Sequence, residues 1–535
     1  MTDIDGPETL PAHSATRPDT ILGGKETPTR AADLKAVAKG SIIQFVGTGT
    51  NRASSLLFLA IAIRLLGAAE FGVYRQIAQL LMMTGMFATL GFDAALLRSV
   101  AQARARDVPG AIRSATRASV TTVTIASLAF VLPIFLAAEP IAGLFADDPS
   151  QRGEMAFLLR LGAFFIPVYA VAKLLSTGTM GFKTVVPLVL VRDVLQPVSL
   201  LLLSTAAIVA GFGVAGAVGG LVASALVALV AAVSFYRRLV PNEPSHPHPT
   251  SSFRSMAGFA LPRAGARALR WASMGTLILG ILGADRDVAL FAVATSLQGI
   301  VLIFPLAFQS VWQPTVVDLV ERKETQRLGA IYQTVNRWVA SCSFGFLVAL
   351  VVLPDPLVRI LGGSSVQEAA LLTSIIALGT LVQVGTGLCG MLVTMAGYPV
   401  ITLVNTIAVF CLYAVGAWLV VPRYGVVGMA CIHAAAAALD NLVMVTVAKR
   451  ITGLQPFGRS FLKPVAATGV AGLTLLLWRV LVERSLPFDL LGLALAAALY
   501  GGSLWVTGMD AEDRIVYERI RARLRAVLPG RTPSC

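Results

Sequence analysis

The chain has 535 residues, of which 56% are hydrophobic and 13% are charged, and its formal net charge is +14. A water-soluble protein of this length needs far more charge to cover its surface, so the composition excludes a soluble globular fold and indicates a protein that lies in lipid. A positive net charge is also typical of nucleic-acid binding proteins, but here the basic residues are spread along loops between apolar segments, so we expect no nucleic-acid partner.

The first 40 residues are polar and mixed in charge, without the apolar core and cleavage site of a signal peptide. We expect residues 1–40 to form a disordered cytoplasmic tail and the first apolar segment to serve as the insertion signal.

Fourteen apolar segments follow, each long enough to cross a bilayer, which takes about 20 residues. They lie at roughly 42–66, 73–97, 118–137, 154–178, 184–210, 214–234, 257–282, 288–315, 331–353, 369–394, 401–421, 426–448, 464–482 and 490–507. The sequence therefore predicts an all-α polytopic membrane protein with about 14 transmembrane helices.

The basic residues of the loops alternate with these segments. If the N-terminus is cytoplasmic, loops on that side hold 27 Lys and Arg, and loops on the other side hold 5. Cytoplasmic loops carry such an excess of positive charge. We therefore expect both termini in the cytoplasm, with residues 508–535 forming a basic cytoplasmic tail.

The sequence repeats itself with an offset of 216 residues. Leu66-Gly67, Pro140-Ile141 and Gly181-Phe182 recur as Leu282-Gly283, Pro356-Leu357 and Gly397-Tyr398, and the turn Gly213-Val214-Ala215-Gly216 recurs as Gly425-Val426-Val427-Gly428 with an offset of 212. One repeat covers six spans, so the two copies enter the membrane in the same direction and form parallel lobes. The expected parts are an N-lobe (41–238, helices 1–6), a cytoplasmic inter-lobe linker (239–256), a C-lobe (257–448, helices 7–12) and two peripheral helices (449–507).

Eleven basic residues but only four acidic residues fall within the predicted spans. Charged groups are costly in hydrocarbon, so the deep ones should face a cavity, and their excess of positive charge implies an anionic substrate. Arg263, Arg267 and Arg270 follow one another at spacings of four and three residues on one helix face, and Arg52 is placed at similar depth by the repeat. Snorkelling to the headgroups or packing between the lobes is the alternative for this cluster.

Several other ionisable residues have two interpretations each. Arg192 lines the cavity or lies outside it, and the adjacent Asp193 need not pair with it, because neighbouring helical residues point about 100° apart. Asp93 is an internal ion-pair partner or an ion ligand. His433 and Asp440, seven residues apart, form a proton relay or bond locally between helices. Metal-ligand spacing, Walker motifs and GxGxxG turns are lacking in the sequence, so we expect no metal, no cofactor and no catalytic residues.

The stretch 41–98 contains Leu66-Gly67 followed by Phe71-Gly72-Val73-Tyr74, and closes with Gly91-Phe92-Asp93. With the Gly-Val-x-Gly turns and the layout of six, six and two spans, the chain resembles the Wzx-like, O-antigen-type flippases. These form the polysaccharide-transporter branch of the multidrug/oligosaccharidyl-lipid/polysaccharide exporter superfamily. The resemblance implies two lobes that alternate access around a cationic cavity for a polyprenyl-diphosphate oligosaccharide. The second lobe lacks the Phe-Gly-Val-Tyr form, so only the arginines on spans one and seven are carried over.

We therefore expect a flippase of the bacterial cytoplasmic membrane rather than an enzyme. It would translocate a lipid-linked glycan for cell-surface polysaccharide biosynthesis, with the bilayer and the glycosyltransferases or polymerase of the pathway as partners. One alternative is a cation-coupled multidrug exporter of the same superfamily, which would favour an acidic cavity. Another is a membrane glycosyltransferase or polymerase, but the longest external loops, at 138–153 and 354–368, are too short to hold a catalytic site.

Overall fold

The computed structural model describes residues 28–105, 108, 110–145, 148–182, 184–240, 253, 256–258, 260, 275–321 and 323–508. These residues form helices joined by short connections, and no strand occurs among them. Helices suit this sequence because every backbone hydrogen bond is satisfied within the element, as hydrocarbon requires.

The first group of helices corresponds to the predicted N-lobe. It comprises α1 (Pro28–Leu66), α2 (Ala68–Ala88), α3 (Phe92–Ala105), α4 (Gly110–Leu136), α5 (Ala138–Ala142), α6 (Pro149–Ala163), α7 (Phe165–Gly178), η1 (Thr179–Phe182), α8 (Val186–Val189), η2 (Leu190–Leu195), α9 (Gln196–Ala207), η3 (Ile208–Phe212) and α10 (Gly213–Leu239). Helix α1 begins at Pro28, within the segment predicted as a tail, and residues 1–27 lie outside the described part of the chain.

The second group corresponds to the predicted C-lobe and the last two helices. It comprises α12 (Gly275–Leu282), α13 (Asp285–Val301), α14 (Ile303–Glu321), α15 (Thr325–Val352), α16 (Asp355–Gly362), η5 (Gly363–Val366), α17 (Ala369–Gly385), α18 (Cys389–Met395), α19 (Pro399–Thr452), η6 (Arg459–Phe461), α20 (Leu462–Leu481) and α21 (Leu486–Val506). Most of the predicted linker, residues 241–252, and the predicted basic tail from residue 509 lie outside the described residues.

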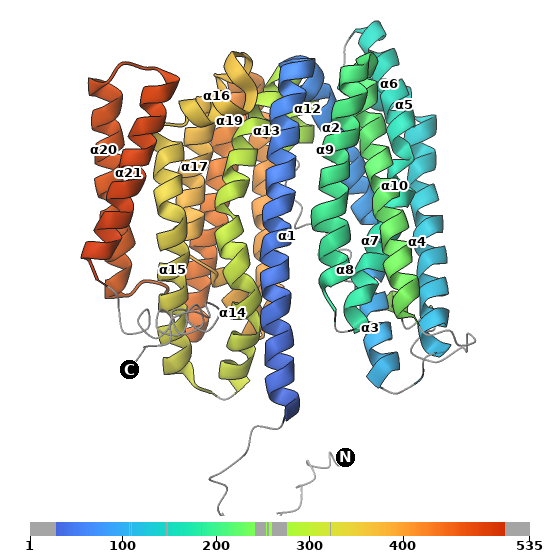
Figure 1. The fold of residues 1–535 in the computed structure, drawn as a ribbon, viewed down its shortest axis with the longest axis horizontal. Coiled ribbons are helices and arrows are strands. Elements are labelled where there is room, and N and C mark those ends of the chain that lie inside the picture. Colours follow the sequence, from blue (N-terminus) through green and yellow to red (C-terminus); the bar gives the residue numbers. More distant parts are fainter. Residues whose placement is uncertain are drawn as a thin grey trace, which may run out of the picture.

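The two groups stand side by side with their helices upright (Figure 1). Helix α1 runs down the middle of the view, against α9 of its own lobe and α13, α14 and α16 of the other. Helices α20 and α21 pack on α15 at the outer side of the C-lobe, where the sequence places the two spans outside the duplication. Helix α1 begins and α21 ends at the same edge, which we call the tail face; the edge where α1 ends is the distal face.

The internal repeat is visible in the backbone. Two stretches of 54 residues, Val186–Leu239 and Pro399–Thr452, each contain a sharp turn at a glycine of the repeated Gly-Val motif. Gly213 has φ 51° and ψ −136°, and Gly425 has φ 55° and ψ −144°. L-residues rarely adopt such positive φ values, so both turns require glycine. Each stretch therefore doubles back, as the predicted span pairs 184–210 with 214–234 and 401–421 with 426–448 require.

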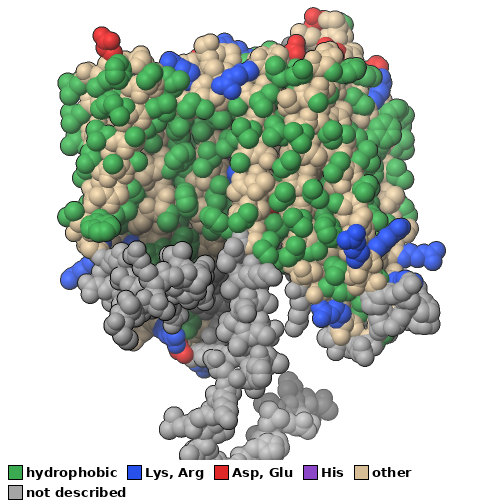
Figure 2. Space-filling model, viewed as in Figure 1, with side chains coloured by type: hydrophobic (Ala, Val, Ile, Leu, Met, Phe, Trp, Pro, Cys, Tyr) green, Lys and Arg blue, Asp and Glu red, His purple; other side chains and the backbone are tan. Residues whose placement is uncertain are grey.

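Seven described helices or helical stretches are long and apolar enough to cross a membrane, or ten if each of three bent pairs counts as one span. The bent pairs include α2 with α3 (41°) and α13 with α14 (42°), which are repeat counterparts. Figure 2 shows hydrophobic side chains covering the flank of the molecule, with charged side chains near its upper and lower edges. The chain is a multi-pass membrane protein. Its number of spans is not fixed at 14 by the described residues, because residues 261–274 lie outside them.

Candidate substrate-binding site

Arg52 reaches from one lobe to the other. It lies on α1, and its half-buried guanidinium packs against Gly299 of α13, where a Cβ atom would stand 2.9 Å from Nη1. Gly299 is buried and leaves the space that the guanidinium fills. Arg52 therefore lies where the two lobes meet, against α13.

Arg192 and Asp193 form a two-point ion pair. Arg192 Nε lies 2.8 Å from Asp193 Oδ1, and Nη2 lies 2.7 Å from Oδ2. Both residues belong to η2, a π-helical turn. The wider winding of a π-helix changes the angle between neighbouring side chains, so the α-helical spacing of about 100° does not apply to this pair. The sequence-based expectation that Arg192 and Asp193 need not pair assumed a regular α-helix. In the structure the two residues do pair, in a π-helical turn.

This ion pair is joined to α1. Gln44 donates a hydrogen bond to Asp193 Oδ2 (3.0 Å), and the Asn51 side-chain amide donates to the backbone carbonyl of Arg192 (3.4 Å). Since Asn51 precedes Arg52, the two predicted cavity arginines lie at the same level of the fold. Asp193 is 7% exposed and Arg192 is 47% exposed. Asp193 thus neutralises a cation that still reaches an accessible surface.

Helix α2 carries a further cation, Arg75, that the sequence did not single out as a site residue. The Nε atom of Arg75 is buried and has no hydrogen-bond partner among the described residues. The Nε2 atom of Gln79, one turn further along α2, is also buried and has no hydrogen-bond partner among the described residues. Helix α2 packs against α13 of the other lobe. The signal in the sequence was the polar face formed by Arg75, Gln76 and Gln79 within an apolar span.

Asp93 pairs inside the N-lobe. Its Oδ1 atom accepts a hydrogen bond from the backbone N–H of Ala94 (2.9 Å), and its Oδ2 atom lies 3.9 Å from Nζ of Lys173 on α7. Asp93 is 2% exposed. Of its two interpretations, the ion-pair partner matches these contacts.

His433 and Asp440 contact different partners in the C-lobe. His433 Nε2 lies 3.2 Å from Gln298 Oε1, and its Nδ1 lies 3.5 Å from the Tyr413 hydroxyl. Asp440 accepts a short hydrogen bond from the side-chain amide of Asn405. Local bonding between helices therefore accounts for these contacts, and a direct bond between His433 and Asp440 is not among them.

The three remaining candidates, Arg263, Arg267 and Arg270, lie outside the described residues. Ala260 marks the near end of this gap: its backbone carbonyl packs against Gly91, at the break between α2 and α3. The ring of Phe253 stacks on Phe92 with centroids 6.0 Å apart. The start of the C-lobe thus rests on the N-lobe near the break.

The lobes meet closely at the distal face. Gly72 of α2 packs against the backbone of Asp285 at the start of α13, where a Cβ would stand 2.6 Å from the carbonyl carbon. The Gln76 side chain donates a hydrogen bond of 2.7 Å to the Asp285 carboxylate. On α1, Arg64 donates a hydrogen bond to the carbonyl of Ile360 in α16. These three contacts join the two lobes at the distal face.

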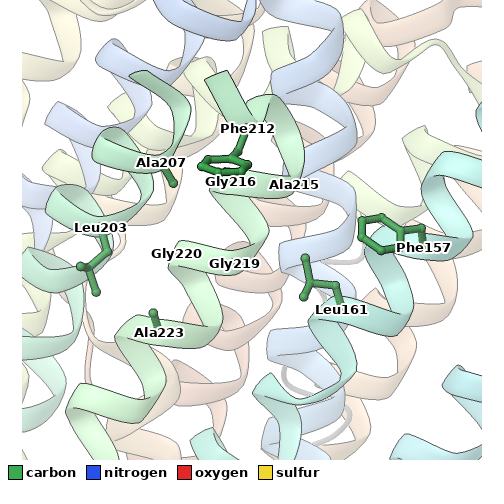
Figure 3. A pocket seen from close by; sticks show the side chains of 10 residues that line it. All are labelled: Phe157, Leu161, Leu203, Ala207, Phe212, Ala215, Gly216, Gly219, Gly220 and Ala223. Atoms are coloured by element: carbon green, nitrogen blue, oxygen red, sulfur yellow. The ribbon is translucent and has the colours of Figure 1, made fainter. Parts of the chain in front are cut away.

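A separate pocket of about 470 Å³ lies at the flank of the N-lobe, between α6, α9 and α10 (Figure 3). It is lined by Phe157, Leu161, Leu203, Ala207, Phe212, Ala215, Gly216, Gly219, Gly220 and Ala223. This lining contains no charged side chain or polar side-chain group, so the pocket offers nothing to bind an anionic group.

Comparison with known proteins places this geometry in context. The sequence model of a family described as "Polysaccharide biosynthesis protein" matches residues 37–320. No curated protein matches the sequence.

The fold is similar to that of several solved membrane transporters. A structure of the lipid II flippase MurJ in an inward closed conformation matches with a TM-score of 0.72 and 10% identity, over 87% of this chain and 98% of that one. A MATE transporter of Vibrio cholerae matches with a TM-score of 0.56 and 14% identity, over 82% of this chain and 100% of that one. An inward-facing MATE family transporter of the MOP superfamily matches with a TM-score of 0.59 and 15% identity, over 75% of this chain and 94% of that one. At these identities the likeness shows the shared fold.

Proposed function

Because this chain belongs to the polysaccharide biosynthesis protein family, we propose that it translocates a polyprenyl-diphosphate-linked oligosaccharide across the bacterial cytoplasmic membrane by alternating access. The product would serve cell-surface polysaccharide biosynthesis, with the glycosyltransferases or polymerase of that pathway as partners. Both termini would lie in the cytoplasm, at the tail face. The likeness to a lipid II flippase supports a lipid-linked substrate.

The observation that carries this proposal is the position of Arg52 between the lobes, against Gly299. A guanidinium keeps its charge at any physiological pH and offers two parallel hydrogen bonds to phosphate oxygens. A cation between two lobes can contact the diphosphate when the lobes separate on either face. The buried Arg75 and the accessible edge of Arg192 add cations on α2 and η2. Arg263, Arg267 and Arg270 would supply the matching cations of the C-lobe.

The main alternative, a cation-coupled multidrug exporter, would need carboxylates available to a cationic drug. Two of the N-lobe acids inside the predicted spans are engaged instead: Asp193 with Arg192 and Asp93 with Lys173. These contacts favour an anionic substrate. Gradient coupling through His433 or Asp440 stays a proposal, and it is tested by proton-driven transport in the variant H433A.

The test is flipping of a fluorescent polyprenyl-diphosphate glycan by the purified protein in proteoliposomes. Loss of a charged hydrogen-bond donor costs about 1.5–3 kcal/mol, so R52A should transport roughly 10- to 100-fold more slowly at low substrate concentration. R52K should retain part of the rate, because it keeps the charge but loses the two-point geometry. The double variant R267A/R270A should abolish flipping.

The matched control is R160A, which removes an arginine of an exposed ion pair with Glu139 in the same lobe. Such pairs contribute at most about 1 kcal/mol, so R160A should transport like the parent protein. Equal rates for R52A and R160A, with both proteins inserted and folded, would remove Arg52 from the mechanism.

A further inference from the structure

Four exposed arginines gather at the tail face of the N-lobe. They are Arg104 at the end of α3, Arg117 in the first turns of α4, and Arg237 and Arg238 at the end of α10. We call them the basic surface. Figure 2 shows blue side chains at the lower right, over the ends of these helices as labelled in Figure 1.

Packing holds the basic surface together. The hydroxyl of Tyr236, next to Arg237, lies 2.7 Å from Thr116 Oγ1, next to Arg117. The same tyrosine ring meets the edge of Phe182 with centroids 6.3 Å apart. Arg104 donates a hydrogen bond to the carbonyl of Gly181 (3.4 Å). The helix ends that carry the arginines are therefore fixed to one another, so the like charges stay close.

The described part of the chain supplies no acidic partner for the basic surface. Among the residues that the structure describes, none of the four arginines forms an ion pair with a carboxylate. Three arginines toward the distal face do form such pairs: Arg160 with Glu139 (3.2 Å), Arg286 with Glu368 (3.0 Å) and Arg484 with Asp355 (2.8 Å). Fixed like charges repel one another, and an anion from outside the chain relieves that repulsion.

The orientation rule for basic loops does not by itself produce this cluster. With the repeat offset of 216, Arg104 and Arg117 correspond to Val320 and Gln333 in the C-lobe. Both lobes need basic residues on this face to set the orientation, yet these two C-lobe positions are uncharged. With the offset of 212, Arg237 and Arg238 correspond to Lys449 and Arg450, so that basic pair is present in both lobes. The N-lobe thus adds Arg104 and Arg117 to a pair that the repeat supplies.

We propose that the basic surface binds the phosphate headgroups of anionic phospholipids. Its arginines stand at the ends of membrane-spanning helices, at the level where headgroups lie, and a guanidinium binds phosphate with two parallel hydrogen bonds. Because headgroups surround the helix ends on this side, several arginines can be satisfied at once without a dedicated protein partner. This role is independent of what passes between the lobes.

The experiment compares two double variants of the full-length protein in nanodiscs of phosphatidylcholine with a titrated fraction of phosphatidylglycerol. R117Q/R237Q removes two charges of the basic surface. R359Q/R423Q removes two exposed arginines toward the distal face. The measurement is the apparent affinity for phosphatidylglycerol from native mass spectrometry, with unfolding in pure phosphatidylcholine as the check on folding.

Each basic residue near an anionic membrane contributes about five-fold in affinity, so R117Q/R237Q should bind phosphatidylglycerol roughly 25-fold more weakly at low salt. R359Q/R423Q should bind like the parent, and R117K/R237K should retain most of the affinity. Added salt should lower the phosphatidylglycerol affinity of the parent toward that of R117Q/R237Q. Equal affinity of the two Gln variants would overturn the proposal. So would equal stabilisation of the parent by inorganic phosphate, or by an acidic soluble protein in place of lipid.

Discussion

Alanine at position 72 should force the lobes apart at the distal face. The new Cβ would overlap the carbonyl oxygen of Asp285 and stand 2.6 Å from its carbonyl carbon. Ordinary contacts begin at 3.4 Å, so the carbon contact alone requires about 0.8 Å of separation between α2 and α13, and the oxygen contact requires more. The obstacle is backbone, which cannot rotate away as a side chain can. The strain is therefore relieved only by moving one lobe against the other.

The same displacement breaks the hydrogen bond next to it. The bond from Gln76 to the Asp285 carboxylate is 2.7 Å long and would lengthen beyond about 3.5 Å, the limit for a hydrogen bond. A bond to a charged group contributes about 1.5–3 kcal/mol. The equilibrium between closed and open distal faces should shift by roughly 10- to 100-fold toward the open form. Transport that depends on closing this face should slow.

Distances between spin labels measure this shift. After replacement of the five native cysteines, labels at E70C on α2 and R359C on α16 report the separation of the lobes by double electron–electron resonance. The matched control is G219A, where the new methyl group meets nothing within 4 Å. Helix propensity alone favours alanine over glycine by about 1 kcal/mol, so G219A should be stable with unchanged distances. A distance distribution for G72A that equals those of G219A and the parent would refute the reasoning.

Two further predictions concern stability, measured by thermal unfolding in detergent. G220A should destabilise the protein by about 1–3 kcal/mol, because its Cβ would stand 2.6 Å from the backbone nitrogen of Ser204 where α9 and α10 pack closely; stability equal to G219A would contradict this. R484Q should lower Tm at pH 7, because Arg484 pairs with the partly exposed Asp355 (2.8 Å) and with the buried Asp489 (3.4 Å); the pair with Asp355 contributes at most about 1 kcal/mol. Burial opposes ionisation of Asp355, but the Arg484 guanidinium has the larger effect and lowers the pKa of that carboxyl. The ion pair therefore stabilises the fold fully above pH 3.8. The difference in Tm between the parent and R484Q should disappear as the pH falls through the lowered pKa. A difference that persists unchanged at low pH would show that Arg484 acts by packing instead.

The candidate site was only partly predictable. The depth of Arg52 followed from the repeat, and the structure places its guanidinium between the lobes. The pairing of Arg192 with Asp193 was missed because a π-helical turn leaves no mark in hydrophobic periodicity. Arg75 was missed because distance from a span end does not reveal whether a long side chain turns toward the headgroups or into the bundle.

The sequence by itself determined the all-helical membrane fold and the two glycine turns at Gly213 and Gly425. These are local properties, since apolar length, loop charge and positive φ are each written in a few neighbouring residues. Only the tertiary structure decided which distant residues come into contact: Gln44 with Asp193, Gln76 with Asp285, and Arg52 with Gly299. Such contacts join residues up to 247 positions apart and depend on how whole helices pack, which no local pattern specifies.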